Sequence, residues 1–207
     1  SYKSSWRGSS KGLWAGRTMG TPCLLVALLA WPTLCSALSQ QGAATSVLER
    51  HDLPSSTCAD GSTGFFYMAP NTSSNDYIFR LMGGAGCVYD ESRCEEIRDL
   101  SPALFTSDGW PDTSVGYGLL SGNEAENPLF STYNRVFVPY CTQDFHLLDT
   151  ESSDGELQFR GRPYLEETLS SVLGNSSQGS TAVLLGTSAG GVAAFNAVSW
   201  LLDSFDQ

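Results

Sequence analysis

The stretch that most constrains the fold is Gly186-Thr187-Ser188-Ala189-Gly190-Gly191. It matches Gly-x-Ser-x-Gly, the pattern of a nucleophile elbow, in which a serine lies at the tip of a tight turn between a strand and a helix. Glycine is needed two places before and after the serine, because this strained turn leaves no room for side chains. The motif therefore predicts Ser188 as a nucleophile; the alternative is a glycine-rich turn with an incidental serine.

The residues on either side of the motif fit the elbow. The apolar run at residues 181–185 is typical of a buried central strand. Apolar residues at helical spacing follow the glycines and predict a helix with one apolar stripe, formed by Ala194, Val198, Leu201 and Phe205.

A second glycine-rich segment, Gly83-Gly84-Ala85-Gly86, follows a predicted strand at residues 76–81. It lacks the spacing of a dinucleotide fingerprint, and no lysine follows Lys11, so a phosphate-binding loop is disfavoured. An oxyanion hole fits better, because hydrolases of this kind take one donor from the residue after the nucleophile and one from an earlier glycine-rich loop. These donors are the N–H of Ala189 and that of Gly84 or Ala85.

The first 37 residues resemble a secretory signal peptide. Residues 1–18 are polar and basic, residues 23–34 are apolar, and Cys35-Ser36-Ala37 supplies the small residues of a cleavage site. The apolar run is shorter than the roughly 20 residues of a membrane span, so we expect a secreted protein with no membrane span. Met19 is a possible start, which would make residues 1–18 an upstream extension; a short N-terminal anchor is the alternative.

The rest of the chain divides into a lead-in and one domain. Residues 38–56 are small and polar without periodicity, which predicts a flexible lead-in that includes His51. Over residues 57–207 the predicted strands are 64–68, 76–81, 135–139, 157–159 and 181–185, and a helix begins at Pro163 and ends at Gly174. Its inner face is Leu165, Leu169 and Val172. Strands interleaved with helices predict an α/β fold with parallel central strands.

Four cysteines lie outside the signal peptide, at Cys58, Cys87, Cys94 and Cys141. An even number in a secreted chain indicates two disulfides, with three possible pairings. A zinc site is disfavoured because no CxxC pair is present, and we expect no metal and no cofactor. Asn71 and Asn175 begin N-glycosylation sequons.

The charge of the chain disfavours polyanionic partners. The formal net charge is −11. All charged residues within residues 1–37 are basic, so removal of this segment would make the chain more acidic. Nucleic acid and anionic membrane are therefore disfavoured as partners.

Taken together, the chain resembles the pectin acetylesterase and Notum carboxylesterase family over about residues 57–205. The matching anchors are residues 58–62, 81–87, 127–128, 136–141 and 186–191, together with Cys94 and Asp144. The chain departs from the family at Met82, where the family usually has Glu, and at Ala85 and Gly86, where the family has a tryptophan. It also departs after Cys141, where it reads Thr142-Gln143-Asp144-Phe145-His146.

The resemblance implies an α/β-hydrolase fold, present here as its N-terminal part, and a secreted serine esterase without a cofactor. It places Ser188 on the nucleophile and Gly84, Ala85 and Ala189 on the oxyanion hole. It also implies the disulfides Cys58–Cys141 and Cys87–Cys94. The expected substrate is an acetyl ester on an extracellular polysaccharide. The alternatives are an acylated secreted protein and a catalytically dead relative that binds glycans.

The order of residues also predicts how reactive Ser188 is in this chain. In α/β-hydrolases the histidine and the carboxylate that activate the serine follow it in the sequence. No histidine follows Ser188 here, and the carboxylates that follow, Asp203 and Asp206, lie on the elbow helix. We therefore expect the chain as it stands to lack efficient esterase activity. His146 lies on the same rim as Ser188 but is a poor candidate for the base.

Overall fold

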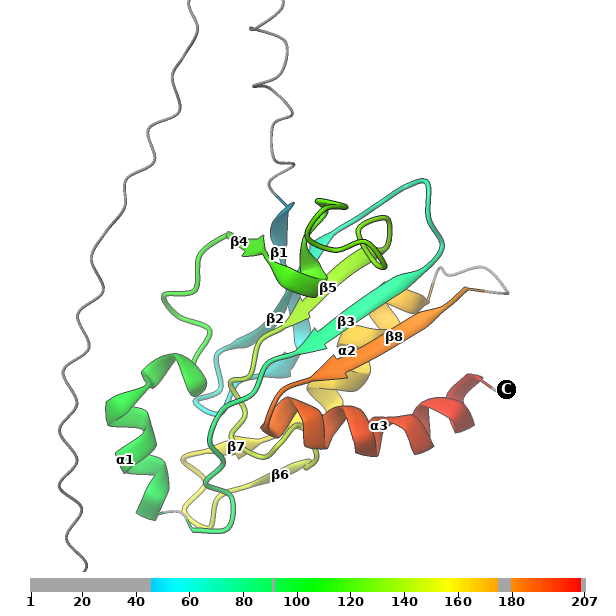
Figure 1. Cartoon of the computed structure of the whole chain (residues 1–207). Helices are drawn as coiled ribbons and strands as arrows, with labels where there is room; N and C mark the ends of the chain where they lie inside the picture. Colours follow the sequence, from blue (N-terminus) through cyan, green and yellow to red (C-terminus); the bar gives the residue numbers. More distant parts are fainter. Residues whose placement is uncertain (1–45, 91, 175–179, 206–207) are drawn as a thin grey trace, which may run out of the picture. The chain divides into compact units, whose positions relative to one another are not determined.

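The computed structural model describes residues 46–90, 92–174 and 180–205, with the side chains of the last helix up to Val198. Its centre is a six-stranded sheet in the order β4-β1-β2-β5-β3-β8 (Figure 1). The strands are β1 (Ser46–Thr57), β2 (Thr63–Ala69), β3 (Tyr77–Leu81), β4 (Thr113–Gly116), β5 (Asn134–Val138) and β8 (Ala182–Gly186). β3 pairs in parallel with both β5 and β8, whereas β1, β2 and β4 pair antiparallel. The prediction of an α/β fold with parallel central strands is therefore confirmed.

Helices and a small second sheet complete the fold. The helices are α1 (Ser92–Leu100), α2 (Gly161–Leu173) and α3 (Ala189–Phe205), with the short 3₁₀ helices η1 (Pro102–Leu104) and η2 (Gly118–Leu120). β6 (Thr150–Glu151) pairs with β7 (Gln158–Phe159). Among these, the sequence patterns predicted α2, β7 and α3, and they missed α1, β4 and β6, which are short or largely polar.

The prediction of a flexible lead-in over residues 38–56 is wrong for residues 46–56. They form β1, which pairs with β2 on one side and with β4 on the other. Leu48 and Leu53 are buried, but they are separated by five positions and do not give an alternating pattern. Pairing with two neighbouring strands fixes β1, and a short window of sequence does not contain that information.

The helices pack on the sheet through small and aliphatic residues. Leu165, Leu169 and Val172 of α2 are buried, as predicted, and α2 lies behind the sheet in Figure 1. Of the predicted stripe of α3, Ala194 packs half-buried against the core, but Val198 is half exposed, and Ala193 and Ala197 are the fully buried residues. The side chains of Leu201 and Phe205 lie outside the described residues. The small alanine side chains let α3 approach the sheet closely, so the helix turns them inward in place of larger neighbours.

Candidate active site

The elbow is built as the motif predicted, directly between β8 and α3. Ser188 has φ +54°, in the left-handed region, and it is exposed. A Cβ on Gly186 would lie 1.9 Å from the carbonyl oxygen of Gly190, and one on Gly190 would lie 2.3 Å from that of Leu81. Only glycine fits at these two positions. The turn therefore presents the serine hydroxyl outward on a strained backbone, which is the geometry of a nucleophile elbow.

The glycine loop, defined as residues 83–86, lies against this elbow. β3 and β8 are parallel neighbours, so their carboxyl ends meet at one edge of the sheet. A Cβ on Gly83 would lie 2.1 Å from the carbonyl oxygen of Thr187 and 3.0 Å from Cβ of Ser188. The structure thus brings together the two segments that the sequence singled out separately.

The backbone donors expected for an oxyanion hole belong to the two segments that meet through Gly83. Ala189 is the first residue of α3, where backbone N–H groups lack intrahelical partners and the helix dipole favours negative charge. Within the described residues, the N–H groups of Gly84, Ala85 and Ala189 donate no hydrogen bond to another part of the chain. These backbone N–H groups are therefore free to bind a negatively charged group.

A third segment, residues 140–146, follows β5 and lies behind the glycine loop; we call it the support segment. Its Asp144 is buried, and burial raises the pKa of the carboxyl group. The carboxylate accepts hydrogen bonds from the Thr142 hydroxyl and from the backbone N–H groups of His146, Leu148 and Gly161, at 2.7 to 3.1 Å. The sequence showed Asp144 only as a family anchor; three of its donors lie within four residues of it, and the fourth, Gly161, lies 17 residues later.

The two histidines of the chain occupy different environments. His51 is exposed on β1 and its ring stacks on that of Phe66 at 5.1 Å, so its predicted place in a flexible lead-in is wrong. His146 is 2% exposed, and its ring lies 4.8 Å from that of Tyr140. Its Nε2 lies 3.5 Å from the carbonyl oxygen of Met82, and burial lowers its pKa to about 4. No hydrogen bond joins either ring to Ser188 among the described residues.

Both disulfides implied by the resemblance are present and flank the site. Cys58–Cys141 joins the residue after β1 to the support segment. Cys87–Cys94 joins the end of the glycine loop to α1. The two bridges anchor the support segment and the end of the glycine loop, which follow β5 and β3, the two strands nearest to β8 in the sheet order.

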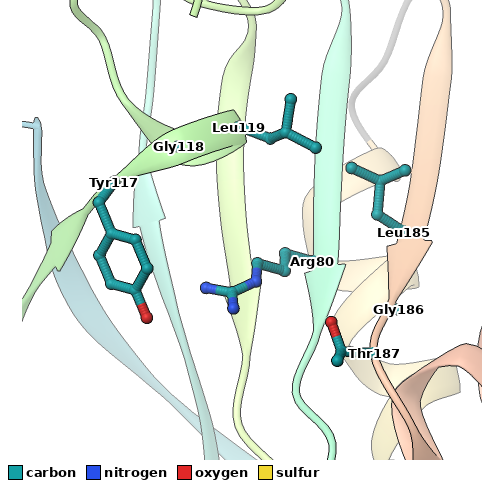
Figure 2. Close-up of a pocket in the computed structure, with 7 residues that line it drawn as sticks. All are labelled: Arg80, Tyr117, Gly118, Leu119, Leu185, Gly186 and Thr187. Atoms are coloured by element: carbon teal, nitrogen blue, oxygen red, sulfur yellow. The ribbon is translucent and has the colours of Figure 1, made fainter. Parts of the chain in front are cut away.

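A cavity of about 330 Å³ lies next to the elbow, and Gly186 and Thr187 form part of its wall (Figure 2). Its lining residues are Arg80, Tyr117, Gly118, Leu119, Leu185, Gly186 and Thr187. The Arg80 guanidinium lies 5.3 Å from the Tyr117 ring centroid, and no carboxylate in the described chain forms an ion pair with it. One cation between apolar walls suits a ligand that has a single anionic group.

The expected signal peptide and glycosylation sites stay predictions. Residues 1–37, with the expected signal peptide, and Asn175 lie outside the described residues. The Asn71 side chain donates to the carbonyl of Thr132 at 2.7 Å, and its glycosylation stays a prediction. Among the described residues, no group of three His, Cys, Asp or Glu side chains could hold a metal ion, and no helix has the length and apolarity to cross a membrane.

Comparison with known proteins adds a family and a fold. A family model described as pectinacetylesterase matches residues 37–207. The human palmitoleoyl-protein carboxylesterase NOTUM is 34% identical over 137 residues, which are 65% of this chain and 27% of the relative. Palmitoleoyl-protein carboxylesterase notum1 of Xenopus laevis is 30% identical over 73% of this chain and 31% of the relative. The chain thus spans about a quarter to a third of the length of these curated relatives.

Comparison with a solved structure extends this similarity from the sequence to the fold. The Wnt deacylase Notum from Drosophila superposes with a TM-score of 0.66 at 32% sequence identity, over 73% of this chain and 46% of the solved one. The mixed sheet and its helices therefore have counterparts in that structure, and the prediction of a partial α/β-hydrolase fold is confirmed.

Proposed function

Because this chain belongs to the pectinacetylesterase family, whose Notum relatives are carboxylesterases by name, we propose that it hydrolyses carboxylic esters with Ser188 as the nucleophile. The observation that carries the proposal is the packing of the glycine loop on the elbow: Gly83 has room only for a hydrogen beside Thr187 and Ser188. This contact brings an exposed, strained serine and the N-terminus of a 17-residue helix to one point.

The proposed reaction has two steps. The Ser188 oxygen attacks the ester carbonyl, and the negative charge on the carbonyl oxygen is stabilised by the N–H of Ala189 and by that of Gly84 or Ala85. The bond to the alcohol then breaks, leaving an acyl group on Ser188, and water hydrolyses this acyl-enzyme to release the acid. Each such donor is worth roughly a hundredfold to a thousandfold in rate.

The proton of Ser188 has to pass to a base and from there to the leaving alcohol. In hydrolases of this fold the base is a histidine oriented by a carboxylate. His51 lies on β1, and His146 is held neutral by burial with its Nε2 directed at Met82. We therefore assign neither histidine as the base of Ser188.

The substrate proposed first is an acylated protein, since the curated relatives at 30–34% identity are palmitoleoyl-protein carboxylesterases. An acetyl ester of a polysaccharide is the second candidate, favoured by the family model. Ala85 and Gly86 bring no bulky side chain to the loop where a family tryptophan is expected.

Two disulfides favour an oxidising compartment, which supports the proposal that the protein is secreted.

The test uses the full natural protein and the 207-residue chain side by side. A fluorophosphonate probe should label the full protein at Ser188, and Ser188→Ala should abolish both labelling and hydrolysis of p-nitrophenyl esters. Ser55→Ala, an exposed serine on β1, is the matched control. Comparing acetate with octanoate and palmitoleate esters separates the two substrate classes. A folded full protein without Ser188-dependent labelling or turnover would support the non-catalytic, glycan-binding alternative.

A further inference from the structure

The glycine loop has almost no means of holding its own shape. Gly83, Gly84 and Gly86 carry no side chain, and Ala85 is exposed. Such a backbone is free to adopt many conformations. Oxyanion stabilisation, in contrast, depends on donors fixed to within about half an ångström. Contacts from other segments are therefore needed, and the support segment supplies them at Gly84 and Gly86.

Aromatic rings of the support segment fill the space above the glycines. A Cβ on Gly84 would lie 2.5 Å from Cδ1 of Tyr140, and one on Gly86 would lie 2.5 Å from Cζ of Phe145. The two rings are linked, since the Phe145 N–H donates to the Tyr140 hydroxyl at 2.8 Å. The rings therefore stand where side chains of the loop itself would otherwise be.

Polar contacts hold the two ends of the glycine loop. After it, the N–H of Cys87 donates to the carbonyl of Gln143 at 3.2 Å. Before it, His146 Nε2 lies 3.5 Å from the carbonyl oxygen of Met82, and the Met82 N–H donates to Val138 at 2.9 Å. With a hydrogen on Nε2 the imidazole donates to Met82, and its Nδ1 has no hydrogen-bond partner among the described residues.

The support segment is itself held rigidly. Gln143, Phe145 and His146 have φ values of 58°, 61° and 58°, a conformation that bulky residues adopt only when their surroundings enforce it. The enforcing group is the buried Asp144 carboxylate, which accepts hydrogen bonds from the segment and from the start of α2. A simple connection from β5 to β6 needs none of these strained residues.

We propose that His146 is a positioning residue of the oxyanion hole, which acts on the donors of Gly84 and Ala85 through the carbonyl of Met82. This inference rests on the proposed esterase function. It gives the buried histidine a role other than that of a base, and it makes the support segment part of the machinery of Ser188. Asp144 acts one step further away, by fixing the backbone of His146.

Kinetics of the full natural protein test the role. His146→Leu keeps a buried side chain of similar size but removes the donor, and it should lower kcat by about tenfold to a hundredfold with KM changed less than about threefold. His146→Gln can donate from Nε2 to Met82, and it should restore kcat to within about threefold of the wild type. His51→Leu, which removes the exposed histidine, is the matched control and should leave kcat unchanged.

A second measurement needs no activity. Hydrogen exchange of the 207-residue chain should speed up in the peptide covering residues 82–87 in His146→Leu, while β2 peptides stay protected as in the wild type. Unchanged exchange together with unchanged kcat would overturn the proposal, as would a His146→Gln variant as slow as His146→Leu in a folded protein. If His146→Leu does not fold, His146→Phe keeps a buried ring without the donor to Met82; wild-type kcat and exchange in that variant would also overturn the proposal.

The two proposals fail in different ways. If the wild-type protein shows no turnover that depends on Ser188, the proposed function fails, and the exchange data still decide whether His146 fixes the loop. If turnover depends on Ser188 but His146→Leu is indistinguishable from wild type, the esterase assignment stands and the positioning role is wrong.

Discussion

Two loops at the same edge of the sheet hold residues in the left-handed region, and they tolerate it by opposite means. In the elbow after β8, Ser188 adopts φ +54°, and the residues two places before and after it, Gly186 and Gly190, have no side chains. Gly186 and Gly190 come so close to backbone carbonyls that a methyl group would lie 1.9 to 2.3 Å from an oxygen. The elbow thus depends on two glycines, because any side chain at their positions would overlap a backbone carbonyl group.

In the support segment after β5, the side chains are kept and the backbone is held by bonds. Gln143, Phe145 and His146 all have positive φ values. Asp144 at the centre of the segment receives four hydrogen bonds, one of them from Gly161 at the beginning of α2. The support segment is thus shaped by a buried charge.

The difference teaches which change should break each loop. A larger side chain in place of a glycine should destabilise the elbow. In the support segment, the destabilising change should be one that alters the charge of a side chain and keeps its volume. The predictions that follow use this contrast, and each pairs a change in one loop with a control of the same chemistry.

Gly186→Ala should have the largest effect. Its new Cβ would lie 1.9 Å from the carbonyl oxygen of Gly190, and a backbone contact cannot move aside cheaply. We expect a loss of at least about 4 kcal/mol in the free energy of unfolding, the range of exceptional single substitutions. Urea denaturation of the 207-residue chain measures it. Gly191→Ala, whose Cβ would lie 3.3 Å from the nearest atom, should cost less than about 1 kcal/mol; equal losses in the two variants would contradict excluded volume as the cause.

Asp144→Asn should come next, because it keeps volume and changes charge. One carboxylate oxygen becomes an NH₂ group that faces two hydrogen-bond donors, and those donors are left buried without an acceptor. We expect a loss of about 3 kcal/mol in unfolding free energy. The exposed Asp149→Asn is the control and should change stability by less than about 0.5 kcal/mol. A stable Asp144→Asn variant with unchanged exchange at residues 82–87 would show that the charge does not hold the segment.

The same contrast explains what the sequence could predict. The elbow is local: its glycines, its serine and the flanking strand and helix lie within one continuous stretch, so the motif predicted the turn that the structure contains. The glycine loop was also recognised, because three glycines after a strand are visible in isolation. Each feature is encoded by residues adjacent in the chain.

The support segment could not be predicted in this way. Its central carboxylate joins Thr142 to Gly161, and its rings contact glycines more than 50 residues earlier in the sequence. β1 was missed for a related reason, since its pairing with β2 and β4 compensates for a weak apolar pattern. Contacts of this kind arise only once the chain is folded, and neither composition nor periodicity records them.

The pH dependence of stability should report on His146. Burial lowers its pKa from 6.5 to about 4, between the rings of Tyr140 and Tyr164 and next to Asp144. The unfolded chain therefore binds a proton at higher pH than the folded chain does. The stability that comes from the neutral ring is fully present above about pH 6.5 and is lost as the pH falls toward 4, by up to about 3 kcal/mol.

Urea titrations at pH 7, 6, 5 and 4 measure this loss. Acidic side chains also titrate near the lower end, so the quantity that matters is the difference between the wild type and His146→Gln. That difference should grow as the pH falls, because glutamine takes up no proton. His51→Gln, in which an exposed histidine is replaced, should follow the wild-type curve. Parallel curves for wild type and His146→Gln would show that burial does not lower the pKa of His146.

The smallest effect should have the opposite sign. Ser188→Gly removes the left-handed strain, which costs about 1–2 kcal/mol for a residue with a Cβ, and the exposed serine side chain makes no hydrogen bond among the described residues. Glycine also makes the unfolded chain more flexible, which takes back about 0.5–1 kcal/mol. We therefore expect a net gain of about 0.5–1 kcal/mol in unfolding free energy, together with complete loss of fluorophosphonate labelling.

Ser188→Ala keeps the Cβ and the strain, so its stability should stay within about 0.5 kcal/mol of the wild type. In the support segment, Gln143→Gly should not raise the free energy of unfolding. It relieves the positive φ, but it also removes the side-chain hydrogen bond from Nε2 to the carbonyl of Leu104 at 3.1 Å. Suppose that Ser188→Gly raises the free energy of unfolding and Gln143→Gly does not. Backbone strain would then be present at the exposed serine alone, as expected where a site gives up stability for reactivity. No gain in Ser188→Gly would mean that the turn is relaxed at Ser188.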